Sequence, residues 1–453
     1  MHILCCCTAF AVLGAASAGE PFIVHEWGVH ITGSAPTSGN SGFHGAGKGD
    51  RDGLDGESGP LPRPILGPPQ ELIDDLPPFV GRHDLEYRPR REGRSRWRKP
   101  VLHFYGSVEG EITVEVLTPQ GRPLAYWPLP QLRLVRQERA HAVGMRWTGR
   151  LTTAAPAGAL PPVAAGHWWQ RCREVPGLYL NTATGSERFL FYEGTSRRSP
   201  TVTALLHQGE LSFLSPHGQP LAGPVVVIVN DAGSLRLATP QLPQQTKLGP
   251  AALQPVGVDG EAILAACRAQ WEAFGMSPVE ARMIVEVWRE DLLTRPGFLV
   301  ITRMSPADYA EMFPLTITPT PDQLVRVGLV FDTLPKIPAA ARLAWLPRLA
   351  AAMQGWAKDL AGEGGPQRTA AIAGLAKAGD LASPLLDELR AGSDLRVRAA
   401  ALDLLGRLRP PTLYTTQPDR EAERQLRPLL PDKPKLAPVP PAVPEEAQPK
   451  TDF

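Results

Sequence analysis

Cysteine is scarce in this sequence and unevenly placed. Of the five cysteines, Cys5, Cys6 and Cys7 lie at the start, so only Cys172 and Cys267 remain in the rest of the chain. The sequence has no CxxC pair and no cluster of Cys with His, which excludes the usual structural zinc frameworks. In an oxidising compartment Cys172 and Cys267 would be free to pair, and two separate buried thiols are the alternative.

The sequence also lacks a charge excess and a long apolar run. Its formal net charge is +1. Binding to nucleic acid or to an anionic membrane surface calls for a strong basic excess, so neither is predicted. No uninterrupted run of about 18 apolar residues occurs, so no membrane-spanning helix is predicted. The length of 453 residues is enough for two or three domains with separate cores.

Common catalytic motifs are absent as well. The sequence contains no GxSxG, no HExxH and no Cys–His protease pattern. The segment GFHGAGKG, residues 42–49, resembles a phosphate-binding loop, but Gly49 replaces the Ser or Thr that would hold magnesium. No strand pattern precedes it and no helix pattern follows it. We therefore predict no nucleotide site there.

Residues 1–18 are predicted to be a signal peptide. Ile3 to Ala16 is a short apolar segment, and Ala16-Ser17-Ala18 is a typical small-residue cleavage site. The three early cysteines lie near the start of this apolar segment and not after it, which does not fit a lipoprotein. The predicted location is secreted or periplasmic.

Proline and glycine are abundant, with 49 and 43 residues. This composition favours short strands and turns, and residues 19–245 are predicted to form a β-rich domain with a Gly/Pro-rich insertion at 33–80. Between about residues 99 and 240, apolar runs such as EITVEVL alternate with Gly/Pro turns. The predicted fold of this part is an antiparallel β-sandwich-like domain.

The second half of the sequence predicts helices. Residues 258–335 read as a small α+β segment, in which Ser277, Pro278 and Glu280 indicate a helix start with a capping box. Residues 338–410 are rich in Ala and Leu and resemble HEAT-like helical repeats. The Pro-rich residues 428–453 are predicted to be a disordered tail. The predicted fold class is therefore multidomain α+β.

The segment FIVHEWGVHITG, residues 22–33, carries two candidate metal ligands, His25 and Glu26. Its alternation predicts a strand, with His25 on the apolar face and with Glu26 and His30 on the other. Glu26 and His30 would lie roughly 13 Å apart, too far for one ion. We therefore expect a buried, hydrogen-bonded His25, and zinc binding through His25 and Glu26 is the alternative.

Three segments resemble a family of uncharacterised exported bacterial proteins with an HEWG start, a KPVxYFY strand and an RFLFYRG strand. They are VHEWG at 24–28, KPVLHFY at 99–105 and RFLFYEG at 188–194. The resemblance implies export and a β-rich fold, and it implies no activity. The sequence departs from the family pattern at His103 and at Glu193, where the family has Tyr and Arg.

Two further candidate sites have simple alternatives. Asp50, Asp52 and Asp55 supply hard oxygen ligands around a glycine, as calcium loops do, although a solvated acidic loop has the same composition. Trp168 and Trp169, in an aromatic-rich region with Trp127, offer ring faces for stacking on a sugar or a peptide. If the Trp pair lies in a strand, one indole faces outward. Core packing is the alternative.

The sequence favours an exported, non-enzymatic binding or scaffold protein that recognises another protein or a glycan. The alternative is a metal-dependent hydrolase of the cell envelope that uses His25, Glu26 and distant histidines. No cofactor is predicted beyond the calcium and zinc of these alternatives. Whether His25 and its neighbours converge on a pocket depends on the fold.

Overall fold

The computed structural model describes residues 20–32, 76–82, 95–119, 121–136, 141–196, 203–207, 209–214, 223–334, 337–362 and 365–408. These ranges belong to one compact unit. The predicted signal peptide, the acidic loop with Asp50, Asp52 and Asp55, and the predicted tail at 428–453 lie outside them. No helix in the described ranges has both the length and the apolar character needed to cross a membrane.

A ten-stranded sheet organises the chain. In spatial order its strands are β18 (Gln254–Pro255), β15 (Ser234–Ala238), β14 (Val226–Asp231), β19 (Gly297–Arg303), β21 (Gln323–Asp332), β1 (Ile23–Thr32), β3 (Ser95–Tyr105), β10 (Phe189–Ser196), β5 (Gly121–Trp127) and β2 (Gly81–Arg82).

A second sheet and two small ladders complete the β structure. The second sheet contains β20 (Leu315–Thr318), β4 (Gly110–Thr118), β7 (His141–Thr152), β8 (Tyr179–Thr182) and β9 (Gly185–Glu187), with β6 (Gln131–Arg136) paired to β7. The ladders join β11 (Thr203–His207), β12 (Glu210–Leu214) and β17 (Lys247–Leu248), and β13 (Gly223–Pro224) with β16 (Gln241–Leu242).

The helices are α1 (Trp168–Glu174), α2 (Glu261–Ala273), α3 (Pro278–Thr294), α4 (Pro306–Met312), α5 (Ala339–Leu343), α6 (Pro347–Asp359), α7 (Pro366–Ala378), α8 (Ser383–Ala391) and α9 (Leu395–Leu408). Of two short 3₁₀ turns, η1 (Pro250–Ala252) lies between β17 and β18, and η2 (Gly379–Ala382) lies between α7 and α8. The chain is therefore α+β with large, mostly antiparallel sheets, which confirms the coarse prediction.

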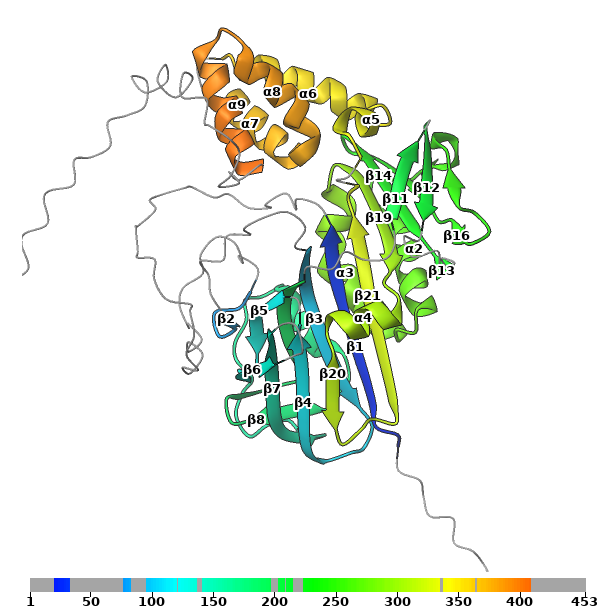
Figure 1. Ribbon diagram of the computed structural model, residues 1–453, viewed down its shortest axis with the longest axis vertical. Helices are drawn as coiled ribbons and strands as arrows, with labels where there is room; N and C mark the ends of the chain where they lie inside the picture. Colours follow the sequence, from blue (N-terminus) through cyan, green and yellow to red (C-terminus); the bar gives the residue numbers. More distant parts are fainter. Residues whose placement is uncertain are drawn as a thin grey trace, which may run out of the picture. The chain divides into compact units, whose positions relative to one another are not determined.

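Strand β1 lies inside the large sheet, between β3 and β21 (Figure 1). Its ladder to β3 is antiparallel, whereas its ladder to β21 is parallel, with Ile23 opposite Gln323 and Thr32 opposite Asp332. Residues 23–32 thus form a strand, as predicted for the segment that begins at residue 22. Its parallel partner, β21, lies about 300 residues later in the sequence.

Strands from the two predicted segments, 19–245 and 258–335, pair with one another in the same sheets. Strand β19 pairs with β14, β21 pairs with β1, and β20 pairs with β4 of the second sheet. The change in sequence character near residue 258 therefore marks the first long helix and not the edge of a sheet.

The two faces of β1 enter different cores, as its alternation predicts. Trp27, Val29 and Ile31 pack with side chains of α2 and α3. Val24 belongs to a core between the two sheets that includes Val114 of β4. The central part of the large sheet is thus covered by helices on one face and by the second sheet on the other.

A third core joins the large sheet to the helices at the C-terminal end of the described chain. Val227 of β14 and Val300 of β19 pack with Leu346, Leu375 and Leu404, which belong to the α5–α9 region. Helix α6 packs against α7, and α8 packs against α9. The expectation that residues 338–410 are helical is met as far as residue 408.

The contact between α6 and α7 depends on the absence of a side chain at Gly374. A Cβ added there would lie 2.6 Å from the ring of Trp356, whereas a Cβ at Gly355 in α6 would meet nothing within 4 Å. We predict that Gly374→Ala lowers the free energy of unfolding by about 1–3 kcal/mol through overpacking.

The matched change Gly355→Ala is predicted to raise the free energy of unfolding by about 0.5–1 kcal/mol, because alanine is the better helix former. Chemical denaturation of both variants measures the two values. Equal effects from the two substitutions would contradict the close packing of Trp356 on Gly374.

Candidate functional site

Several polar side chains converge on Glu280, at the start of α3. The Ser277 hydroxyl accepts from the Glu280 backbone N–H at 3.3 Å, and Glu280 Oε2 accepts from the Ser277 backbone N–H at 3.0 Å. This is the capping box predicted from the sequence. The box fixes the carboxylate against the first turn of the helix.

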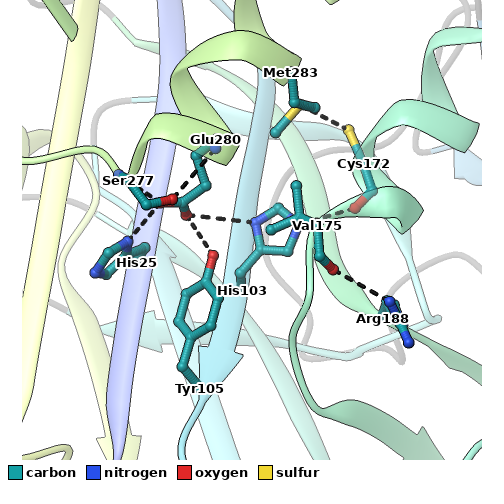
Figure 2. Close-up of polar contacts among 9 residues, drawn as sticks. All are labelled: His25, His103, Tyr105, Cys172, Val175, Arg188, Ser277, Glu280 and Met283. Atoms are coloured by element: carbon teal, nitrogen blue, oxygen red, sulfur yellow. Dashed lines mark hydrogen bonds and ion pairs between the residues drawn. The ribbon is translucent and has the colours of Figure 1, made fainter. Parts of the chain in front are cut away.

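The same carboxylate connects α3 to two strands of the large sheet (Figure 2). His25 Nδ1 of β1 lies 2.7 Å from Glu280 Oε2, and the Tyr105 hydroxyl of β3 donates to Oε1 at 2.7 Å. The Ser277 hydroxyl also donates to Oε2 at 2.7 Å. Four donors therefore contact one buried carboxylate, which matches the approximately four lone-pair positions of an ionised carboxyl group.

His103 completes this group, which we call the Glu280 cluster: His25, His103, Tyr105, Ser277 and Glu280. His103 lies opposite His25 in the β1–β3 ladder, on the same face of the sheet. Its Nε2 is 3.2 Å from the carbonyl oxygen of Cys172, and its Nδ1 is 3.9 Å from Glu280 Oε1. Because a carbonyl only accepts, Nε2 carries the proton of the neutral ring and Nδ1 does not.

Burial and hydrogen bonding set the charges in the Glu280 cluster. Burial alone would raise the pKa of Glu280, but the hydrogen bond from His25, the electrostatic interaction with the two nearby imidazoles and the hydrogen bond from Tyr105 outweigh it and bring this pKa to about 2. Burial lowers the pKa of His103, and the attraction of Glu280 offsets this only in part. Burial, followed by the proximity of Glu280, raises the pKa of Tyr105. The cluster thus holds an ionised Glu280 beside a neutral His103 and a protonated Tyr105.

Glu26 belongs to a different buried group, on the opposite face of β1. It accepts from the hydroxyl of Tyr192 and from Arg326 Nε, and Arg326 also donates to the carbonyl of Phe313 at 2.8 Å. The arginine lies over the ring of Tyr309, 4.3 Å from its centroid. Glu26 therefore links β1, β10 and β21 in the core between the sheets, and it does not share a site with His25.

His30 also points away from His25. It is fully buried, its ring lies 5.6 Å from the Trp97 ring, and neither ring nitrogen has a hydrogen-bond partner in the described part of the chain. Burial lowers its pKa to about 3. In the ranges that the structure describes, no group of three or more His, Cys, Asp or Glu side chains is arranged to hold a metal ion.

The tryptophans expected to offer a stacking surface are buried. Trp168 and Trp169 lie in α1 and not in a strand, so they do not point to opposite faces of a sheet. Trp169 donates to Glu187 at 2.9 Å, and Phe79 packs on Trp169 and on Trp127. Trp127 and Trp168 are 6% and 9% exposed. These residues form a helix and not the expected strand, because His167 caps the helix N-terminus and the indole rings of Trp168 and Trp169 pack in a core.

Lys99 is a buried cation that the sequence pattern did not single out. Its Nζ lies 4.7 Å from the ring centroid of Trp168 and 4.9 Å from that of Trp288. Its backbone N–H donates to Glu193 at 3.1 Å, and its φ of 54° is rare for a residue with a side chain. It sits where the β1–β3 and β10–β3 registers shift, so a bulge turns this side chain toward the helices.

Both cysteines of the described ranges are free and buried. The Cys172 thiol donates to the sulfur of Met283 at 3.7 Å, and burial raises the pKa of both thiols. Of the two alternatives open from the sequence, the structure has separate buried thiols, which are protonated and unreactive.

No protein-family model matches the sequence, and comparison with curated proteins and with solved structures finds no match. The chemistry of the Glu280 cluster must therefore be judged from its own geometry.

The geometry of the Glu280 cluster is that of a structural cross-link. The carboxylate is completely buried and its acceptor positions are occupied by donors from α3, β1 and β3. The His25 side chain is 13% exposed, so its ring edge is the part of the cluster nearest to solvent. The hydroxyls beside this His–Glu pair, those of Ser277 and Tyr105, both donate to Glu280, and Ser277 also caps α3.

We predict that Glu280→Gln lowers the free energy of unfolding at pH 7 by about 3 kcal/mol, because a neutral amide cannot replace the ionised acceptor. The folded pKa of about 2 lies below the ordinary value of 4.5. The stabilisation is therefore present above pH 4.5 and is lost as the pH falls toward 2.

Urea denaturation of the wild type and Glu280→Gln at pH 7 and at pH 3 tests this prediction. The difference between them should shrink at pH 3. Glu261→Gln is the control, since Glu261 is 55% exposed and pairs with Arg289 on the surface, so its effect should be small at both pH values. If Glu280→Gln lowered the free energy of unfolding equally at pH 7 and pH 3, Glu280 would not have a lowered pKa in the folded state.

We predict that His30→Leu makes the protein less sensitive to acid. The folded pKa of His30, about 3, lies below the ordinary 6.5, so the folded state binds fewer protons than the unfolded state between these values. Stability is therefore lost as the pH falls from 6.5 toward 3, by roughly 3 kcal/mol at pH 4. At pH 4 the variant should gain most of this amount relative to the wild type. Equal pH profiles from chemical denaturation would show that His30 is not buried and neutral.

Proposed function

We propose that the chain is an exported, non-enzymatic protein that binds a protein partner through its surface. The observation that supports this most strongly is the full occupation of Glu280 by internal donors. Glu26 is likewise held by Tyr192 and Arg326, and Glu187 by Trp169 and Arg173. Buried carboxylates that are all committed to internal contacts connect elements of the fold and leave no acceptor for a substrate or a metal.

The choice of a protein over a glycan rests on the aromatic side chains. Trp127, Trp168 and Trp169 were the rings that favoured sugar stacking, and they are buried in the core beside α1. A sugar-binding surface needs exposed ring faces, whereas a protein-binding surface does not depend on them.

Export is supported by the apolar segment and cleavage site at residues 1–18 and by the resemblance of VHEWG, KPVLHFY and RFLFYEG to exported bacterial proteins. The proposed binding surface is the outer side of helices α8 and α9. The two packed pairs, α6–α7 and α8–α9, are consistent with a short HEAT-like array whose inner side rests on the large sheet.

A photo-crosslinking amino acid at position 388 tests the proposed surface. Glu388 is exposed on α8, and Glu290, which is exposed on α3, is the matched control position. In cells that export the protein, we expect one discrete crosslinked protein from position 388 and none from position 290. The absence of an adduct at 388, or the same adducts from both positions, would contradict a specific partner at α8–α9.

The metal-dependent hydrolase is the second candidate, and the His25–Glu280 contact of 2.7 Å is the observation in its favour. Metal analysis separates the two candidates. We expect the purified full-length protein to hold no stoichiometric zinc or calcium, and His25→Ala to leave its metal content unchanged, because the donors of Glu280 already occupy the carboxylate. One equivalent of zinc that is lost in His25→Ala would favour the hydrolase.

A further inference from the structure

One edge of the second sheet is unpaired in the part of the chain that the structure describes. Strand β6 pairs with β7 on one side, and its backbone makes no other hydrogen bond within the described ranges. In an antiparallel ladder, alternate residues direct their N–H and C=O groups to the partner strand, and the others direct them away from it. About half of the residues of β6 therefore present free backbone donors and acceptors at this edge.

Strand β6 lacks the features that protect most edge strands. Protected edges are very short, or they carry proline or outward-pointing charges. At the two ends of the second sheet, β9 has three residues, and β20 has four residues between Pro314 and Pro319. Strand β6 has six residues and no proline, and its Leu134 is 57% exposed. The edge is thus open to a further strand.

Arg133, in the middle of β6, is directed away from the edge. It lies opposite Gly144 of β7 and donates to Glu115 of β4, the strand beyond β7. A Cβ added at Gly144 would lie 3.2 Å from Cγ of Arg133 and 3.1 Å from Oε1 of Glu115. The arginine side chain therefore crosses β7 over this glycine. Its charge is paired inside the same chain and does not block the edge.

We propose that β6 pairs with β6 of a second copy of this chain, which joins the two second sheets across a two-fold axis. Two copies of one strand pair antiparallel around such an axis, and each contact is made twice. The free backbone groups of each edge then find donors and acceptors on the other. This pairing does not rest on the proposed function, because it needs no other partner.

The side chains of β6 select the register of this pairing. Side chains directly opposite one another share a face of the sheet, so the residue on the axis lies opposite its own copy. Only Arg133 and Leu134 stand in the middle of the strand. With Arg133 on the axis, two like charges would be opposite each other, which is destabilising. With Leu134 on the axis, two exposed leucines cover each other and Arg133 lies opposite Val135, so this register is favoured.

Sedimentation equilibrium of the full-length protein tests the pairing. A six-residue edge is smaller than the about 20–30 residues a side of a standard interface, so we expect a reversible dimer in the micromolar to millimolar range. Leu134→Lys should raise its dissociation constant about tenfold or more, because two lysines replace the leucine pair. A protein that stays monomeric throughout this range would overturn the proposal.

Leu205→Lys is the matched control, since Leu205 is 39% exposed on β11, an edge strand of the three-stranded sheet. It should leave the dissociation constant unchanged. An effect as large as that of Leu134→Lys would show that the copies do not associate specifically through β6, and the proposal would fail.

A disulfide tests the register. Cys5, Cys6 and Cys7 are first replaced by serine, and the cysteines of the described ranges are buried. Leu134→Cys should link two copies on oxidation, because directly opposite Cβ atoms lie about 4.5–5.5 Å apart. Val135→Cys should link far less, because its two copies are diagonal neighbours about 7–8 Å apart. Equal linking of the two variants would overturn the register, and no linking of either would overturn the pairing.

Discussion

The structure depends on the placement of β1 in the middle of the large sheet. This strand has a ladder on each side, antiparallel to β3 and parallel to β21, so its backbone is paired along its length. Each face then enters a different core, one with the helices and one with the second sheet. Apart from the partly exposed Ile23 and His25, the strand is buried on both faces, so its polar residues need partners inside the protein.

Two polar residues of β1 meet that requirement, and a third does not. His25 and Glu26 each connect β1 to a separate layer: His25 joins α3 through Glu280, and Glu26 joins β10 and β21 through Tyr192 and Arg326. His30 has no such partner and stays neutral. The neighbouring polar residues of the segment therefore act as contacts between layers, which explains why they look like a catalytic motif and yet diverge in space.

The same principle extends along the large sheet. Asp231, at the end of β14, accepts from the backbone N–H of Leu349 at the start of α6, and Arg236 of β15 donates to the carbonyl of Trp345 at 2.7 Å. These contacts accompany the apolar core that the sheet shares with α5–α9. Arg295 differs, because two of its guanidinium nitrogens lack the internal acceptor that these groups have.

Local patterns in the sequence determined the strand at residues 23–32, the alternation of its faces and the helix start at Ser277, because each depends on neighbours within a few residues. The sequence did not determine that Glu280 would meet His25 and Tyr105, which are 255 and 175 residues away. Nor did it determine the burial of Trp168 and Trp169, because the helix that holds them is short and its core comes from distant strands. Only the parallel pairing of β1 with β21 and the packing of α3 on this sheet decided those contacts, since chain separation carries no information about which faces meet.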